Sequence, residues 1–168
     1  PGHVKMSSKR LFLIDGSALA YRSHFAYARN PLTTSTGRPT GAVFGFVQAI
    51  LRLLDMEKPD YLAVAFDTPE PTFRHKKFKA YKATREKMDD LLVAQLPWIK
   101  QAIEGYRIPL IEMPGYEADD VIGTIAKKAE KEGFEVFIVT GDKDFMQLIS
   151  DKVKLYNIFK RESEAAEI

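Results

Sequence analysis

The sequence predicts a single α/β domain with a central, mostly parallel sheet and helices on both of its faces. Short apolar runs rich in strand-forming residues recur along the chain, and amphipathic helical patterns lie between them. Strands that alternate with helices pair in parallel, because each crossover helix returns the chain to the same end of the sheet. With 168 residues and 45 % hydrophobic content, the chain can bury one ordinary core.

Three apolar runs are the clearest strand candidates, and each is about one strand long. They are Leu11 to Ile14, Tyr61 to Phe66 and Phe134 to Val139. Two shorter runs, Pro109 to Met113 and Val153 to Ile158, are candidates for further strands.

Helices are expected where apolar residues recur three or four positions apart. The patterns are Val43, Phe46, Val47, Ile50, Leu53 and Leu54; Leu91, Leu92, Trp98, Ile99 and Ile103; and Val121, Ile122, Ile125 and Ala129. Trp98 and three methionines, Met56, Met113 and Met146, lie in or beside apolar patterns, so we expect them in the core.

The segment from about 68 to 90 interrupts this alternation and is expected to project from the core as a basic arch. Two prolines lead into a polar stretch without an apolar face. Residues 72–88 hold seven Lys and Arg against one Glu, a net charge of +6, which leaves −4 for the rest of the chain. A basic segment beside an acidic remainder suggests a polyanionic partner held next to a site that needs carboxylates.

Composition excludes some classes of protein. The chain has no cysteine, which rules out disulfides and thiolate zinc sites. No apolar run approaches the roughly 18 residues of a membrane span, and the first residues lack the apolar stretch of a signal peptide. Residues 1–5 are interpreted as a cloning remnant, and 6–168 as the domain.

An aspartate follows each of the three clearest strands. Asp15 comes after LFLI, Asp67 after YLAVAF and Asp142 after FIVTG. Because the carboxyl ends of parallel strands meet at one edge of the sheet, these side chains should converge. Four more carboxylates lie in the motifs GYEADD and TGDKDF, namely Glu117, Asp119, Asp120 and Asp144.

So many anions in one place require a cation between them. Oxygen ligands without cysteine or clustered histidine favour Mg²⁺ or Mn²⁺ over zinc. Two such ions can activate water and stabilise the leaving oxygen of a phosphodiester. The sequence therefore predicts a site for divalent ions.

Helix capping is the competing interpretation of the aspartates. An Asp after a strand is often an N-cap, and Asp119 or Asp120 could simply stabilise a helix start. Taken singly, each residue is explained as well by capping as by metal. Capping does not, however, explain why carboxylates from separate segments should all lie at one edge of the sheet. Their expected convergence therefore favours metal binding.

The basic segment FRHKKFKAYKATR suits contacts with nucleic acid. Arg74, Lys82 and Arg85 can reach phosphates, while interleaved aromatic residues such as Tyr81 can stack on unpaired bases. The alternative is a solvated loop with local aromatic packing. Arg22 could reach a phosphate or form a structural salt bridge, and the sequence leaves both open. His24 and His75 have no partner at ligand spacing and are assigned no function.

The motifs FLIDGSALAYR, VAFDTPEPTFR, YKATR, GYEADD and VTGDKDFMQL, in this order, closely resemble the 5′ nuclease domain of bacterial DNA polymerase I, within the flap endonuclease family. The resemblance spans Lys9 to Phe159. It implies a PIN-like (resolvase-like) fold, two metal ions, and hydrolysis of phosphodiesters in 5′ flaps or RNA primers during primer removal and DNA repair. It also implies a bacterial, cytoplasmic, nucleoid-associated monomer that acts on DNA together with the other domains of a polymerase.

The resemblance assigns roles to individual residues. It implies a first metal cluster of Asp15, Asp67, Glu117, Asp119 and Asp120, and half of a second in Asp142 and Asp144. It implies catalytic roles for Asp15, Asp67, Lys82 and Arg85, and DNA contacts for Arg22, Arg74, Tyr81, Lys82 and Arg85. The segment 68–90 resembles the arch through which a 5′ strand passes.

One departure from the family pattern affects the expected activity. The family continues with two further aspartates and a helix-hairpin-helix element that grips duplex DNA, and the chain stops at Ile168 before either. We therefore expect a fragment that binds one ion, binds DNA weakly and cleaves poorly by itself.

Three other functions remain open at this stage. A PIN-type ribonuclease shares the acidic edge but does not need the arch. A non-catalytic nucleic-acid-binding module would tolerate loss of Asp67. A phosphotransfer receiver also gathers aspartates at strand ends, but it leaves the basic segment unexplained.

Overall fold

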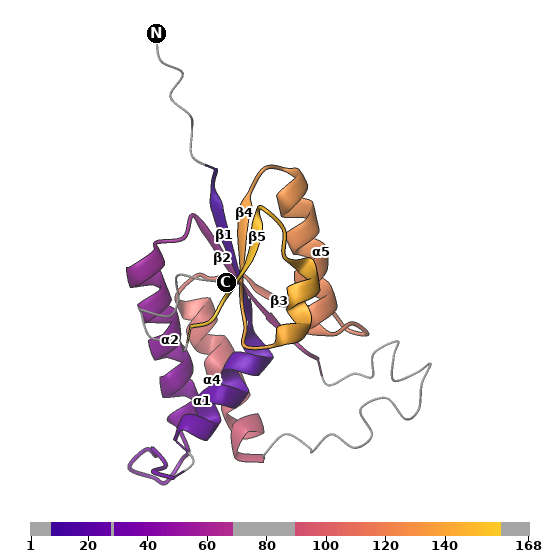
Figure 1. Ribbon diagram of the computed structural model, residues 1–168. Coiled ribbons are helices and arrows are strands. Elements are labelled where there is room, and N and C mark those ends of the chain that lie inside the picture. The colour runs from indigo at the N-terminus through magenta and orange to yellow at the C-terminus, as the bar shows by residue number, and fades with distance from the viewer. Residues whose placement is uncertain (1–7, 28, 69–89, 159–168) are drawn as a thin grey trace.

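The computed structural model describes residues 8–27, 29–68 and 90–158. Five strands form one sheet in the order β3-β2-β1-β4-β5, and every neighbouring pair is parallel (Figure 1). The strands are β1 (Arg10–Asp15), β2 (Tyr61–Phe66), β3 (Leu110–Glu112), β4 (Glu135–Val139) and β5 (Val153–Tyr156). All five predicted strands are confirmed, with ends that differ by no more than two residues.

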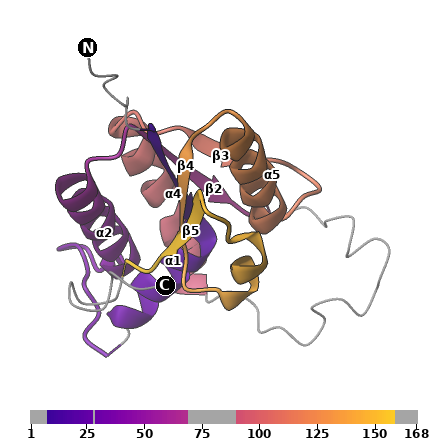
Figure 2. The same ribbon diagram turned by 45° about the horizontal axis from the view of Figure 1, so that its top comes forward.

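Helices cover both faces of this sheet. They are α1 (Gly16–Ala26), α2 (Gly41–Glu57), α4 (Asp90–Gly105) and α5 (Ala118–Lys131), followed by a 3₁₀ helix, η1 (Lys143–Leu148). Helices α1, α2 and α4 lie on one side of the sheet and α5 on the other (Figures 1 and 2). The predicted class, an α/β domain with a parallel sheet between helices, is confirmed.

The alternation of side chains along β1 divides the core into two layers. Phe12 and Ile14 pack with α1, α2 and α4, whereas Leu13 packs with α5. All three side chains are almost fully buried. Because β1 is covered on both faces, it reads as a continuous apolar run in the sequence.

The position of β1 also determines where a site can form. The chain leaves β1 toward β2 and β3 on one side, and later returns to place β4 and β5 on the other side. The direction in which strands are added therefore reverses between β1 and β4, which are neighbours in the sheet. In open parallel sheets, the crevice beyond the strand ends at such a reversal is where ligands bind.

Gly16 fits the first helix tightly against this sheet. A Cβ atom at this position would lie 2.7 Å from Val64 Cγ1 and 2.8 Å from the ring of Phe66. Glycine therefore lets α1 start directly behind β1. As a result, Asp15 is held between a strand and a helix, with little freedom to move.

The expectation that Trp98 and the three methionines pack in the core is wrong. Trp98 is 43 % exposed, and Met56, Met113 and Met146 are exposed as well. The buried stripe of α4 runs through Leu92, Gln95, Ile99 and Ile103, so Trp98 points away from it. Its ring instead lies 4.4 Å from the guanidinium carbon of Arg38.

Two further expectations concern regions outside the core. The segment 68–90, predicted to form a basic arch, lies almost wholly outside the described residues, as does the segment 1–5. No helix in the described part of the chain is both long enough and apolar enough to cross a bilayer.

Candidate functional site

Asp15 lies at the centre of the predicted edge, at the end of β1. Its side chain is only 5 % exposed. One carboxylate oxygen accepts a hydrogen bond from the Ala18 N–H at 3.3 Å, and the other accepts from the Thr140 hydroxyl at 3.3 Å. The register of the sheet explains the second bond, because Ile14 pairs with Val139 and the two strands end together.

Asp67, one residue beyond β2, joins this edge to the start of α5. Its Oδ1 accepts from the Ala118 N–H at 2.7 Å, and its own N–H donates to Ser17 Oγ at 3.0 Å. Glu117, which precedes Ala118, is the N-cap residue of α5 and only 6 % exposed. Asp67 and Glu117 are thus held beside each other although 50 positions separate them in the sequence.

Asp142 is connected to the same edge through Thr140. Thr140 Oγ1 accepts from the Asp142 N–H at 3.1 Å while it donates to Asp15. Asp142 in turn caps η1, because its Oδ1 accepts from the Asp144 N–H at 2.9 Å. The structure therefore brings Asp15, Asp67 and Asp142 to one edge of the sheet, as the sequence predicted.

The surroundings of Asp15 raise the pKa of its carboxyl group. Burial raises its pKa to about 7, and the neighbouring charges of Asp119 and Asp67 add to the increase. Hydrogen bonds from Ala18 and Thr140 oppose the shift, because they favour the ionised form. Nearby positive charge is what would keep such a group ionised at neutral pH.

The chemistry of these donors suits a hard divalent ion, because the ligands at the edge are carboxylate and hydroxyl oxygens. Among the described residues, however, no three acidic or histidine side chains lie as close together as the ligands of one ion.

Helix capping and a shared edge turn out not to be alternatives. Asp15 caps α1 and Asp142 caps η1 through side-chain hydrogen bonds, while Asp119 and Asp120 lie in the first turn of α5. Capping fixes the orientation of Asp15 and Asp142, and the sheet topology places both at the same edge. The capping interpretation is therefore confirmed for Asp15 and Asp142, and metal binding by the same residues stays a prediction.

A groove of about 490 Å³ continues from the acidic edge between α5 and η1. It is lined by Glu117, Asp119, Asp120, Gly123, Thr124, Lys127, Asp144, Phe145, Gln147 and Leu148. Thus Asp144 lies on the η1 side, opposite the carboxylates of α5. All seven predicted metal-site carboxylates belong either to the strand-end edge or to this groove.

The residues predicted to contact DNA can be placed only in part. Arg22 is exposed on α1, and its guanidinium lies near the strand-end loop, 3.8 Å from where a Cβ on Gly141 would be. Arg74, Tyr81, Lys82 and Arg85 all lie outside the described residues. His24 makes an edge-on ring contact with Phe25, at 5.4 Å between centroids.

Sequence reasoning missed the two hydroxyls that organise the edge, those of Thr140 and Ser17. Thr140 is buried and links Asp15 to Asp142, while Ser17 fixes the backbone at Asp67. A polar residue directly after a buried strand and one directly after the DG pair were the available signals. Both were read only as parts of the motifs that contain Asp142 and Asp15.

Residues 10–168 match the family described as 5′-3′ exonuclease, N-terminal resolvase-like domain. The chain is 46 % identical over 149 residues to a 5′-3′ exonuclease of Aquifex aeolicus, covering 89 % of the chain and 51 % of that protein. It is 47 % identical over 144 residues to DNA polymerase I of Bacillus subtilis, covering 86 % of the chain and 16 % of that protein. The chain thus spans about half, or much less, of the length of these relatives.

Solved structures with the same fold include nucleases of bacteriophage T5. The T5 D15 protein co-crystallised with metal ions superposes with a TM-score of 0.65 at 21 % identity, over 88 % of the chain and 54 % of that protein. The T5 D15 flap endonuclease in complex with DNA and metal ions gives a TM-score of 0.63 at 20 % identity, with the same coverage. At this level of identity the similarity establishes the fold alone.

Proposed function

The chain belongs to the family of 5′-3′ exonuclease N-terminal, resolvase-like domains, and on this premise we propose that it is the catalytic, metal-binding part of a 5′ nuclease. Its substrate is DNA with a 5′ flap or a free 5′ end, which it cleaves by hydrolysis of a phosphodiester bond. Relatives described as a 5′-3′ exonuclease and as DNA polymerase I support this proposal. The parent protein is then a polymerase or a separate exonuclease active in primer removal and repair.

One observation carries the proposal: carboxylates from four separate segments meet at the point where strand order reverses. Asp15 ends β1, Asp67 follows β2, Glu117 starts α5 and Asp142 follows β4. Hydrogen bonds through Ser17, Ala118 and Thr140 hold these segments together. A phosphodiester carries a negative charge, so an edge of this kind can accept it only with cations present.

The proposed ligands are Mg²⁺ or Mn²⁺, two ions in a complete domain. Asp15, Asp67, Glu117, Asp119 and Asp120 would hold the first, some of them through water, and Asp142 and Asp144 would contribute to the second. Such ions supply an activated water and stabilise the leaving oxygen. Structural relatives solved with metal ions and with zinc bound support a divalent requirement.

Other residues of the chain orient the carboxylates or contact the DNA in this proposal. Thr140 orients the Asp15 carboxylate, and the Ala118 N–H orients that of Asp67, so that each presents a fixed oxygen to the edge. We assign phosphate contacts to Arg22, Arg74, Lys82 and Arg85, and base stacking to Tyr81. Lys82 and Arg85 lie beside the scissile phosphate in this proposal, and the segment 68–90 forms the passage for the 5′ strand.

Removal of Asp67 tests the proposal. Loss of a residue that only supports a metal ligand typically costs about 10- to 100-fold in activity. Asp67 is itself proposed to hold an ion, so Asp67→Asn should lower the cleavage rate on the order of 100-fold or more. The matched control is Glu104→Gln, an exposed carboxylate on α4 that should leave the rate unchanged. Cleavage of a 5′-labelled flap DNA with Mg²⁺ or Mn²⁺ gives the rates, and circular dichroism confirms the fold.

The same assay includes a matched RNA and a longer protein that continues past Ile168. We expect slow cleavage by the 168-residue chain and faster cleavage by the longer one. Preference for unstructured RNA over the flap would indicate a PIN-type ribonuclease instead. Unchanged cleavage by Asp67→Asn would contradict the proposed site.

A further inference from the structure

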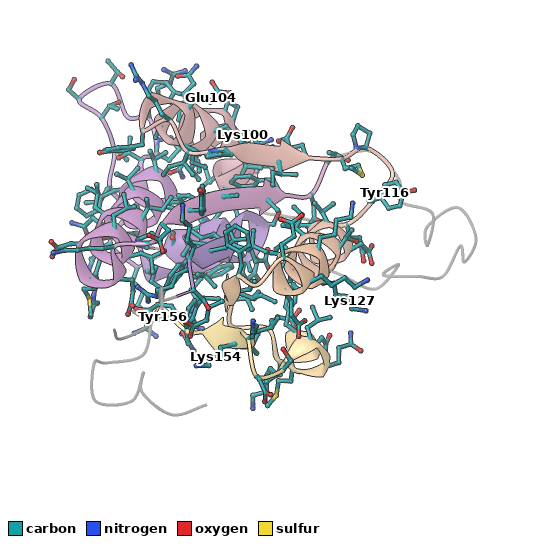
Figure 3. The ribbon with its side chains drawn as sticks, turned by 90° about the horizontal axis from the view of Figure 1, so that it is seen from above. Lys100, Glu104, Tyr116, Lys127, Lys154 and Tyr156 are labelled. Atoms are coloured by element: carbon teal, nitrogen blue, oxygen red, sulfur yellow. The ribbon has the colours of Figure 1, made fainter. Side chains whose placement is uncertain are left out.

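The groove between α5 and η1 is lined by a basic side chain, Lys127, that has no role in the proposed metal chemistry. Lys127 lies at its far end, and in Figure 3 its side chain projects from α5 on the side where η1 (yellow) lies. Every other charged residue in the lining is acidic: Glu117, Asp119, Asp120 and Asp144. Lys127 is thus the sole basic side chain among the described residues that line the groove.

Lys127 has no side-chain partner among the described residues, where it forms neither an ion pair nor a hydrogen bond with another side chain. Glu130, one helical turn further along α5, is positioned to pair with it, but its Oε1 instead accepts a hydrogen bond from Ser150 Oγ at 2.8 Å. No residue in the described part of the chain thus pairs with the exposed ammonium group.

The spacing along α5 relates Lys127 to the acidic edge. Asp120 and Lys127 are seven positions apart, which is about 10 Å along a helix that rises 1.5 Å per residue. This distance exceeds the roughly 3.4 Å by which a strand advances per nucleotide along a duplex axis, so a phosphate at Lys127 is not the one held at the acidic edge. Between the two residues the lining on α5 is Gly123 and Thr124, and the side chain of Leu148 from η1 lies against Gly123.

We propose that this groove is a track for one strand of the nucleic acid, in which Lys127 holds a backbone phosphate other than the one that is cut. This inference rests on the proposed function, because the cut is made at the carboxylate edge. The four acidic groups would otherwise repel the strand along the whole groove, and Lys127 offsets that repulsion at the end where no ion is held. Its role is to position the strand, without any part in the bond-breaking step.

Lys128 provides a matched control. It is the next residue on α5, also an exposed lysine, and it does not line the groove. Lys127→Ala and Lys128→Ala remove the same charge from the same helix. If DNA is attracted only by the overall charge of the helix, both variants should weaken binding equally. If the groove holds a phosphate, only Lys127→Ala should weaken binding.

The test measures binding of a labelled 5′-flap DNA by fluorescence anisotropy at several salt concentrations, with Ca²⁺ as the ion. For Lys127→Ala we expect affinity about 3- to 5-fold weaker at low salt, and a plot of log affinity against log salt that is shallower by about 0.9. Lys127→Glu should weaken binding further, Lys127→Arg should restore it, and Lys128→Ala should change it less than 2-fold. Cleavage with Mg²⁺ should show a raised KM in Lys127→Ala with kcat nearly unchanged.

Two outcomes separate this inference from the function on which it rests. Equal binding by the Lys127→Ala and Lys128→Ala variants, together with cleavage by the wild-type chain, would contradict the proposal that the groove binds a strand. The nuclease assignment would then remain. Failure of the wild-type chain and of its longer form to cleave any 5′-ended DNA overturns the nuclease assignment itself. A selective loss of binding in Lys127→Ala supports the groove.

Discussion

The hydrogen bonds of Asp15 stabilise the fold, whereas its buried negative charge destabilises the fold when no cation is near. Asp15 caps α1 and accepts a hydrogen bond from Thr140, both of which stabilise the fold. Its burial, however, raises the pKa of the carboxyl from 3.8 to about 7. Between these two values the folded chain binds more protons than the unfolded chain. The free energy of unfolding should therefore decrease as pH rises from about 4 to about 7.

The Asp15→Asn variant tests this conflict at the level of one residue. Because asparagine keeps the shape without the charge, the metal-free variant should be more stable than wild type at pH 8, by on the order of 1 to 3 kcal/mol. The difference should vanish near pH 4, where the wild-type carboxyl is protonated. Urea unfolding in EDTA at both pH values measures it.

Asp55→Asn, an exposed carboxylate on α2, is the control and should change stability little at either pH. A gain for Asp15→Asn that is the same at pH 4 and pH 8 would contradict the electrostatic explanation. The variant should still lose cleavage activity, since the proposed ion needs the charge that asparagine lacks.

The sequence predicted which carboxylates lie together at the strand ends, because an aspartate ends or follows each of its clearest strands. Asp15, Asp67 and Asp142 needed only the rule that parallel strands end at one edge. The roles of Thr140 and Ser17 were not predicted, because each depends on hydrogen bonds to residues that are distant in the sequence. Neither composition nor spacing contains the register that places Thr140 level with Asp15.

At the scale of elements, one buried amide joins α4 to α2. Gln95 is 3 % exposed, and its Oε1 accepts from the Ala42 N–H at 2.8 Å and the Val43 N–H at 3.2 Å. Its Nε2 donates to the Leu91 carbonyl at 3.1 Å. The first turn of α2 has no side-chain cap of its own from Thr40, so Gln95 supplies the missing acceptor.

Gln95→Leu should therefore destabilise the fold by about 1 to 3 kcal/mol, because it leaves two N–H groups of α2 buried without an acceptor. Gln101→Leu, an exposed position on the same helix, should change stability by less than about 0.5 kcal/mol. Chemical unfolding of both variants gives the comparison. Equal effects would show that the contact with α2 contributes nothing.

Helices and strands followed from the sequence more readily than the orientation of single side chains. The 3.6-residue pattern located α4, but it did not separate Trp98 from its buried neighbour Ile99. The exposed ring is explained by Arg38, a residue from a loop that no helical pattern describes. Polar Gln95 in a buried stripe was missed for the same reason, since its partners belong to another helix.

At the scale of the whole molecule, an ion at the edge should stabilise the fold by binding only the native state. At 100 times its dissociation constant a ligand adds about 2.7 kcal/mol, which corresponds to a rise in Tm of roughly 5 to 10 °C for a domain of this size. We expect Mg²⁺ or Mn²⁺ to produce such a rise at pH 8, and EDTA to reverse it. Differential scanning fluorimetry gives the values.

The Asp67→Asn variant should lose most of this rise, and Glu104→Gln should keep it. An equal rise in all three proteins would mean that the ions act elsewhere on the surface. The measurement does not depend on cleavage, so it tests the ligand set even if the 168-residue chain is a poor nuclease.

The hydrogen bond between Thr140 and Asp15 spans 125 positions of the chain. During synthesis, the first 140 residues of this sequence must therefore leave the ribosome before the two ends of this bond can meet. A growing chain that carries Asp15 and Asp67 but not yet Thr140 holds these carboxylates without the hydroxyl that links the ends of β1 and β4. The acidic edge is thus completed late, only after β4 has joined the sheet.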